Sequence, residues 1–201
     1  MAGKSGLTLY ASGFSRSRRP LWALEEVGAA YDVVELQFPP KVHHPEYLAI
    51  NPAGAVPALV DGDLMITESL AICDHVSRRF GGTLTVDPGQ PGYLDYLQLL
   101  LYGESTLAVT VGWARRFGPL HKDAMADARD SFTIRLELLQ RSLADGREFL
   151  VADRLTLADI SVAFPLRLAS GFGFDPLMSP EITAYRDRLM ARPACLRAYA
   201  R

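Results

Sequence analysis

The segment 51–70 constrains the fold of this chain more than any other, because it combines a proline turn, a hairpin and a helix start. Pro57 stands at the beginning of an apolar run, where it cannot donate a hydrogen bond to a neighbouring strand. Asp61-Gly62 is a strong hairpin signal between that run and the next. A helical pattern opens at Glu68-Ser69, so free N–H groups and a positive dipole end lie beside the proline turn. This arrangement predicts a site for a small anionic ligand.

The same segment resembles the glutathione-binding half of the cytosolic glutathione transferases, through N-P-x-G-x-V-P-x-L, a D-G turn and T-E-S-x-A-I. In that family the proline matching Pro57 is cis, and the backbone of the residue matching Val56 pairs with the cysteinyl part of glutathione. The residues matching Glu68 and Ser69 hold its γ-glutamyl end. The alternative is a plain edge strand and a capped helix, since only about 5–6% of X–Pro bonds in folded proteins are cis. The order of the pieces favours the family.

Composition is typical of a globular protein and excludes several kinds of partner. Apolar residues make up 49% of the 201 residues, which is enough for a hydrophobic core. The formal net charge is −2 and the one dense basic stretch is 16–19, so we expect no nucleic-acid partner. The first residues lack the apolar part of a signal peptide, and no run reaches the ~18 apolar residues of a membrane helix. Cys73 and Cys195 lie far apart without metal-ligand spacing, which favours a cytoplasmic protein without a metal.

The order of the predicted elements divides the chain into two domains. Strands and helices alternate through 1–81, which predicts a small α/β domain with a mixed sheet and matches the thioredoxin-like half of the transferase family. The Gly- and Pro-rich segment 82–92 is a linker. Only helical periodicity follows, so 93–201 is expected to form the all-α domain of the glutathione transferase fold. The main expected elements are a strand at 7–10, a helix at 18–27, a strand at 31–36, a loop at 39–45, and helices at 68–80, 93–117 and 124–144.

A second motif lies in the helical domain. Thr156-Leu157-Ala158-Asp159 is close to a capping box and opens a helix that Pro165 is expected to kink. The surrounding text resembles the G-D-x-x-T-x-A-D of the family, with Ala152 where glycine is common. We therefore interpret Thr156 and Asp159 as capping residues, not catalytic ones.

Glutathione chemistry needs a group that stabilises the thiolate, because a free thiol near pKa 8.5 is mostly protonated at neutral pH. The family places this group after the first strand, at the start of the first helix. In this chain that region is 12–20, with Pro20 suited to the first helical turn. Arg16 and Arg19 there are either solvated charges or groups that steer the glutathione carboxylates.

Alignments of this loop with different branches of the family place different residues at the catalytic position. The text from Ser15 onward is most similar to a microbial, bacterial-type branch reading S-R-[SA]-x-R-x-L-W-x-L, which implies that Ser15 hydrogen-bonds to the sulfur. Against the bacterial branch with a catalytic cysteine, Arg16 falls on the cysteine, and against the serine branches Phe14 falls on the usual serine. Ser15 is our first candidate, and Ser17 is a second one that the sequence favours more as a helix N-cap than as the catalytic residue. The remaining alternatives are Arg16 and Ser12.

The other ligand contacts are expected on either side of this loop. Several family branches place a basic residue against the glycine carboxylate of glutathione, which implies a role for Lys41, His43 or His44 unless these are solvated loop charges. The second substrate should be small, apolar and electrophilic. A helical stripe at spacings 3, 4 and 4 could form its wall, or belong to a core or a dimer contact. The stripe comprises Tyr102, Ser105, Val109 and Trp113, and Phe14 could add to the same wall.

The resemblance thus implies a homodimeric glutathione S-transferase with glutathione as co-substrate and no metal, membrane or nucleic-acid partner. A glutathione-dependent peroxidase, isomerase or lyase/dehalogenase would use the same site. A non-catalytic glutathione-binding or regulatory family member is a different class of function. The absence of a serine or cysteine at the commonest catalytic positions keeps that alternative open.

Overall fold

The computed structural model describes residues 6–13 and 15–201, apart from the side chain of Lys122. The chain divides into two compact units. The first unit consists of the residues up to 85 together with 193–201, and the second consists of 86–192. The sequence-based boundary places 193–201 with the helical domain. In the structure, the last helix, α9 (Pro193–Ala200), packs instead against the first helix of the chain.

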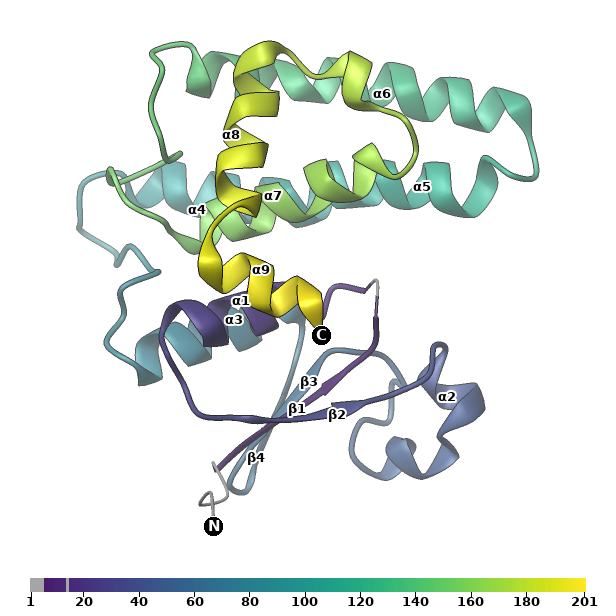
Figure 1. Cartoon of the computed structure of the whole chain (residues 1–201), viewed down its shortest axis with the longest axis vertical. Coiled ribbons are helices and arrows are strands. Elements are labelled where there is room, and N and C mark those ends of the chain that lie inside the picture. The colour runs from purple at the N-terminus through teal and green to yellow at the C-terminus, as the bar shows by residue number, and fades with distance from the viewer. Residues whose placement is uncertain (1–5, 14) are drawn as a thin grey trace. The chain divides into compact units, whose positions relative to one another are not determined.

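The first unit is built on a four-stranded mixed sheet with the order β2-β1-β3-β4 (Figure 1). β1 pairs with β2 in parallel, and β3 runs antiparallel to both β1 and β4. The predicted hairpin turn joins β3 to β4. This mixed sheet with its helices confirms the expected thioredoxin-like α/β domain. The strands are β1 (Leu7–Ala11), β2 (Asp32–Glu35), β3 (Ala58–Asp61) and β4 (Leu64–Thr67).

Two helices of this unit lie side by side, and their first turns form part of the site described below (Figure 1). α1 (Arg18–Glu26) has Pro20 in its first turn and buries Leu21, Trp22 and Leu24. It ends before Gly28, whose φ of +65° is the left-handed conformation that glycine adopts without strain. α3 (Ser69–Arg79) follows β4 directly. The segment expected to be a loop contains α2 (Pro40–His43) and a 3-10 helix (Pro45–Ala49), each with a proline in its first turn.

The second unit is all-helical, as expected. The helix predicted over 93–117 is continuous, but its middle is a π-helical segment that begins at Gly103, where the chain lies directly against α7 (Leu157–Ser170). A Cβ atom on Gly103 would come within 2.4 Å of Ser161 Oγ, so only glycine fits there. The elements are α4 (Tyr93–Tyr102), the π-helical segment (Gly103–Ala108), α5 (Val109–Phe117), α6 (Lys122–Leu143), α7 (Leu157–Ser170), a 3-10 helix (Asp175–Leu177) and α8 (Pro180–Met190).

The start of α7 confirms the capping interpretation of Thr156 and Asp159. Both bonds of a capping box are present, and the Asp159 carboxylate accepts from the Thr156 amide at 2.8 Å. The fully buried carboxylate also accepts from the Leu150 amide and the Tyr185 hydroxyl, each at 2.9 Å. All these neighbours donate, so Asp159 is a structural acceptor that joins a loop and two helices.

The backbone conformation at Ala152 explains why glycine is common at this position in the family. Its φ is +60°, and the next residue, Asp153, has a φ of +50°. This left-handed backbone is easily reached by glycine and strained for residues with a side chain. The chain keeps the loop conformation while carrying alanine.

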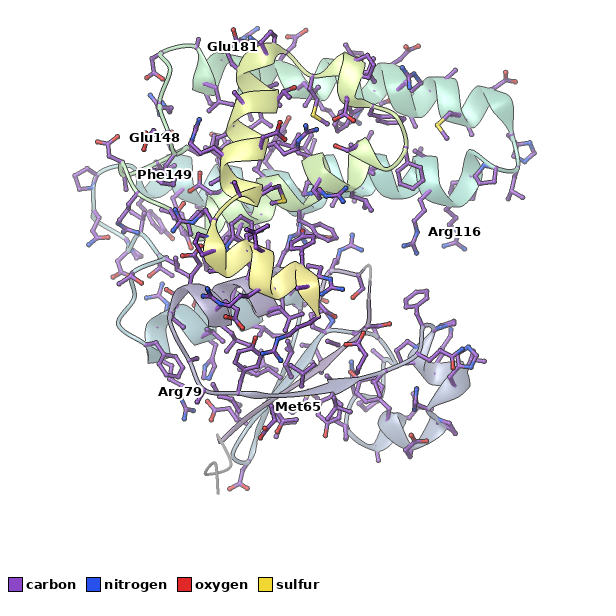
Figure 2. All side chains as sticks on the ribbon, in the orientation of Figure 1. Met65, Arg79, Arg116, Glu148, Phe149 and Glu181 are labelled. Atoms are coloured by element: carbon purple, nitrogen blue, oxygen red, sulfur yellow. The ribbon has the colours of Figure 1, made fainter. Side chains whose placement is uncertain are left out.

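A charged cluster lies at the hairpin end of the sheet, away from the start of α3. The Asp61 carboxylate is within 2.8 Å of His75 Nε2 and pairs with Arg79, whose side chain is labelled in Figure 2. Desolvation by burial raises the pKa of Asp61, but the hydrogen bonds and charges of His75 and Arg79 lower it by more, so the pKa lies below its usual value. This cluster attaches the end of α3 to the hairpin.

Candidate functional site

Three motifs of the sequence meet at the other end of the sheet. Tyr10 of β1 stands opposite Ala58 of β3, so the same antiparallel register, continued by two residues, places Ser12 beside Val56. Ala58 also stands opposite Thr67 of β4, and α3 begins two residues later. The loop after β1, the proline turn before β3 and the start of α3 are therefore neighbours (Figure 1).

The proline turn has the conformation that the resemblance implies. The Val56-Pro57 peptide bond is cis, with Pro57 buried and Val56 half-buried. The preceding peptide, Ala55-Val56, is fixed by two buried side chains. Its Ala55 carbonyl accepts from the Asn51 side-chain amide and from the Tyr47 hydroxyl, each at 2.8 Å. The sequence analysis did not predict that Asn51 and Tyr47 position this turn. Asn51 belongs to an Asn-Pro turn signal, so its part in the turn could have been inferred from the sequence.

The start of α3 combines a strained residue with a helix dipole. Glu68 has a φ of +65°, which is uncommon for a residue with a side chain and costs about 1–3 kcal/mol. Such strain is concentrated at functional sites. The Glu68 side chain is exposed, whereas Ser69 is buried at the first helical position. The Glu68 carboxylate can bind an ammonium group, while the N-terminus of α3 beside it binds a carboxylate.

Arg19 adds a buried positive charge beneath that helix start. It is 1% exposed, and its Nη1 donates to Ser69 Oγ at 3.4 Å. It is therefore not a solvated surface charge. The same guanidinium acts on the Cys73 thiol one turn further along α3, but burial dominates there and raises the pKa of Cys73 to about 12. Cys73 therefore stays protonated, and the positive charge near it favours an anion at the start of α3.

The loop after β1 holds a compact group of serines. Ser15 Oγ lies 2.6 Å from the Ser12 carbonyl and 2.8 Å from Ser17 Oγ, and it accepts from the Ser17 amide at 3.1 Å. Ser17 is fully buried and Ser12 is 5% exposed, whereas Ser15 is partly exposed. Of these three hydroxyls, Ser15 is the one that can reach a ligand. Arg16 is exposed beside it, and Phe14 lies outside the described residues.

The three basic candidates around α2 differ in their surroundings. His44 Nε2 accepts from the Gln37 amide at 3.0 Å, and its Nδ1 lies 3.2 Å from a carboxylate oxygen of Glu46. Both of its ring nitrogens therefore have partners within the loop. Lys41 and His43 are exposed. Lys41 packs against the loop before the proline turn, since its Cβ would lie 2.7 Å from a Cβ on Gly54.

The candidates for the second substrate are only partly brought together. Tyr102 donates its hydroxyl to the Arg135 carbonyl, and Ser105 donates to the Leu101 carbonyl at 2.9 Å, so both bind helix backbone. Val109 and Trp113 are exposed and line a cavity of about 100 Å³ between α5 and α6. Pockets for small molecules usually measure ~300–1,000 Å³, so this cavity alone is small for one.

Two kinds of site or segment are absent from the described part of the chain. No cluster of three or more His, Cys, Asp or Glu residues among residues 6–13 and 15–201 is arranged to hold a metal ion. Within the same residues, no helix combines the length and the apolar character needed to cross a membrane.

Comparison with known proteins identifies the family. The model of the glutathione S-transferase N-terminal domain matches residues 5–78, and that of the C-terminal domain matches residues 107–193. Glutathione S-transferase F10 of Arabidopsis thaliana is 28% identical over 94% of both chains, and glutathione S-transferase 4 of Zea mays is 32% identical over 88% of this chain and 83% of its own.

Solved structures show the same fold. The glutathione transferase URE2P6 of Phanerochaete chrysosporium, in complex with oxidized glutathione, superimposes with a TM-score of 0.83 at 29% identity, over 98% of this chain and 96% of its own. The nitrogen regulation fragment of the yeast prion protein Ure2p gives a TM-score of 0.85 at 25% identity, over 98% and 96%. Because the two family models cover most of the sequence and the maize relative is 32% identical, the chain belongs to the glutathione S-transferase family.

Proposed function

We propose that this protein is a glutathione S-transferase that binds glutathione, stabilises its thiolate and joins the sulfur to a small apolar electrophile. The observation that carries the proposal is the meeting of three features at one end of the sheet. These are the partly exposed Ser15 hydroxyl, the Val56-Pro57 turn and the strained Glu68 before α3.

Each part of glutathione has a chemically matched partner in this site. The backbone of Val56 pairs with the cysteinyl residue, because Val56 lies before the residues of β3 that pair with β1 and β4. The γ-glutamyl ammonium binds the Glu68 carboxylate, and the γ-glutamyl carboxylate binds Ser69 and the N-terminus of α3 above Arg19. Lys41, next to the proline-turn loop, binds the glycine carboxylate.

The chemistry follows from the position of Ser15. Its hydroxyl donates to the glutathione sulfur and lowers the pKa of the thiol, because a hydrogen bond to the charged form favours that form. The thiol loses its proton to solvent, and the sulfur electron pair forms a bond to the electrophilic carbon. The leaving group departs with the electron pair of the bond that breaks. Val109 and Trp113, the exposed hydrophobic members of the predicted stripe, are our candidates for apolar contacts to the electrophile.

Three narrower features belong to the same proposal. The protein acts as a homodimer in the cytoplasm, and it falls in the microbial branch indicated by the residues from Ser15 onward. The curated relatives named above come from plants, so the branch stays a prediction.

A regulatory, non-catalytic function is the second candidate, and two observations favour it. A Ure2p fragment described as a nitrogen regulation fragment shares the fold at 25% identity. In addition, the Ser15 hydroxyl lies 2.6 Å from the Ser12 carbonyl, so its proton already has an acceptor in the protein. Such a protein would bind glutathione without activating it.

Two measurements separate these functions. We expect glutathione at millimolar concentration to raise the melting temperature, because it binds the folded state alone. We expect conjugation of a chlorinated aromatic electrophile to fall roughly 10- to 100-fold in Ser15→Ala, since a hydrogen bond to a charged group contributes about 1.5–3 kcal/mol. Ser142→Ala is the control, because the Ser142 hydroxyl bonds the Leu138 carbonyl within α6.

The outcomes are distinct. Binding without conjugation in the unmutated protein supports the regulatory function. Conjugation that is unchanged in Ser15→Ala assigns the sulfur contact to another group of this loop. Peroxide reduction, isomerisation or dehalogenation in place of conjugation would keep the site and change the reaction. If no thermal shift occurs, the proposed glutathione site is wrong.

A further inference from the structure

The serine loop contains a chain of hydrogen bonds that begins on the backbone and ends on Ser15. The Ser12 amide donates to Ser17 Oγ at 3.4 Å. Ser17 Oγ lies 2.8 Å from Ser15 Oγ, and the Ser17 amide donates to Ser15 Oγ at 3.1 Å. Ser17 is completely buried and Ser15 is partly exposed, so the chain runs from the interior to the ligand side.

Counting protons shows which way these bonds run. A serine hydroxyl has one proton and two lone pairs. The Ser12 carbonyl, 2.6 Å from Ser15 Oγ, can only accept, so Ser15 gives its proton there in the ligand-free protein. Ser15 Oγ then has both lone pairs available, one for the Ser17 amide and one for the Ser17 hydroxyl. Ser17 therefore donates to Ser15, and its own oxygen accepts from the Ser12 amide.

We propose that Ser17 is a positioning residue whose hydroxyl donates to Ser15 Oγ and so leaves the Ser15 proton as the group available to the glutathione sulfur. The inference rests on the proposed function, because it assumes that Ser15 contacts the sulfur. Because the amide and the hydroxyl of Ser17 occupy both lone pairs of Ser15 Oγ, Ser15 can interact with a ligand only through its proton. Two acceptors are available to that proton, the Ser12 carbonyl and the glutathione sulfur. The proton turns from the neutral Ser12 carbonyl to the thiolate when glutathione binds, because hydrogen bonds to charged groups are the stronger ones.

The alternative for Ser17 is an ordinary N-cap. Ser17 stands at the N-cap position of α1, where a serine oxygen usually accepts from the second or third helical amide. Among the described residues of this helix, the Ser17 side chain caps no amide, and its φ of −59° and ψ of −22° are helical. Its oxygen is directed back to Ser12 and Ser15 instead. The bonds that a capping serine would make are replaced by bonds toward the proposed sulfur position.

The test measures the pKa of the thiol of bound glutathione, by following the ultraviolet absorbance of the thiolate as the pH is changed. We expect Ser15→Ala to raise this pKa by about one to two units and Ser17→Ala to raise it by roughly half a unit to one unit. Adding Ser17→Ala to Ser15→Ala should give no further rise, because Ser17 acts through Ser15. Ser17→Cys replaces the hydroxyl by a weaker donor and should give an intermediate shift.

Ser77→Ala is the matched control. Ser77 is also a fully buried serine of the first unit, and its hydroxyl accepts a backbone amide, that of Leu84, at 3.1 Å. It lies in the last part of α3, away from the serine loop. Ser77→Ala should lower the melting temperature as a buried hydroxyl deletion does, and leave the thiol pKa unchanged.

Each result has one meaning. If Ser15→Ala raises the thiol pKa and Ser17→Ala does not, the positioning role of Ser17 is wrong while the proposed function stands. If the two shifts add in the double variant, Ser17 acts independently of Ser15 and the inference is again wrong. If Ser15→Ala has no effect on the thiol pKa, the proposed role of Ser15 fails before Ser17 is considered.

Discussion

Arg19 and Ser17 lie in a stretch that is rich in arginine and serine and has the composition of an exposed loop, yet both side chains are buried. Arginine is rarely buried without partners, so sequence patterns place it at the surface. Here the guanidinium of Arg19 reaches Ser69, fifty residues further along the chain. A contact of that separation has no local signal. Ser15, in contrast, belongs to a local motif, so the sequence alone is enough to propose it, and its role stays a prediction.

Arg19 gives a prediction at this scale. Its positive charge lies beside the proposed site of the γ-glutamyl carboxylate, so Arg19→Met should weaken glutathione binding roughly tenfold, or about 1.4 kcal/mol. Stability should change little, because a buried charge replaced by an apolar side chain of similar volume is often neutral. Isothermal titration gives the dissociation constant, and thermal unfolding gives the stability.

Arg18→Met is the matched control for that measurement. Arg18 is the neighbouring buried arginine, but it donates to the Ala198 carbonyl at 2.7 Å and lies over the Tyr199 ring. Its loss should lower the melting temperature and leave the glutathione affinity unchanged. Equal affinities for Arg19→Met and the unmutated protein would show that Arg19 has no part in binding.

Elements stabilised by neighbours in the chain were predictable, whereas those stabilised by distant residues were not. α1 was expected at 18–27 and lies at Arg18–Glu26, since its proline, its apolar positions and Gly28 are all local signals. The close approach of Gly103 to Ser161 depends on residues far apart in the chain, and α9 depends on α1 for its packing. Neither dependence appears as a periodicity in the sequence.

The attachment of α9 to α1 gives a prediction about pH. Glu25 of α1 accepts from Arg197 Nε and the Tyr31 hydroxyl, each at 2.6 Å. Burial of the carboxyl is outweighed by these bonds, which lower the pKa of Glu25 below its usual 4.5. The carboxylate therefore stabilises the fold above about pH 4.5, and this contribution is lost as the pH falls through the lower, folded-state pKa.

Glu25→Gln should remove that contribution at every pH. At neutral pH we expect the free energy of unfolding to fall by about 1 kcal/mol, since the pair is only partly shielded from solvent. The difference between the two proteins should shrink below pH 4.5, which urea unfolding at a series of pH values would measure. A difference that stays constant into acid would mean that the carboxylate charge does not hold α9.

At the scale of the whole molecule, the two units carry different kinds of evidence about function. The first unit has the cis proline turn, the strained Glu68 and the buried Arg19, so its ligand can be argued from single atoms. The second unit has apolar helix faces, and apolar residues serve cores, interfaces and ligands alike. For this reason glutathione could be inferred from the sequence, whereas the electrophile could not.

The exposed leucines of α4 give the last prediction, which concerns the proposed homodimer. Leu94 and Leu101 are 75% and 54% exposed and lie seven residues apart, on one face of the helix. If that face is part of the dimer contact, Leu94→Glu with Leu101→Glu should give a monomer, because two buried carboxylates would lose their hydration. Light scattering coupled to size exclusion would measure the mass. Leu196→Glu, at a residue of α9 that is 58% exposed, should leave the dimer intact. A dimer that persists in the α4 double variant would place the contact on another surface.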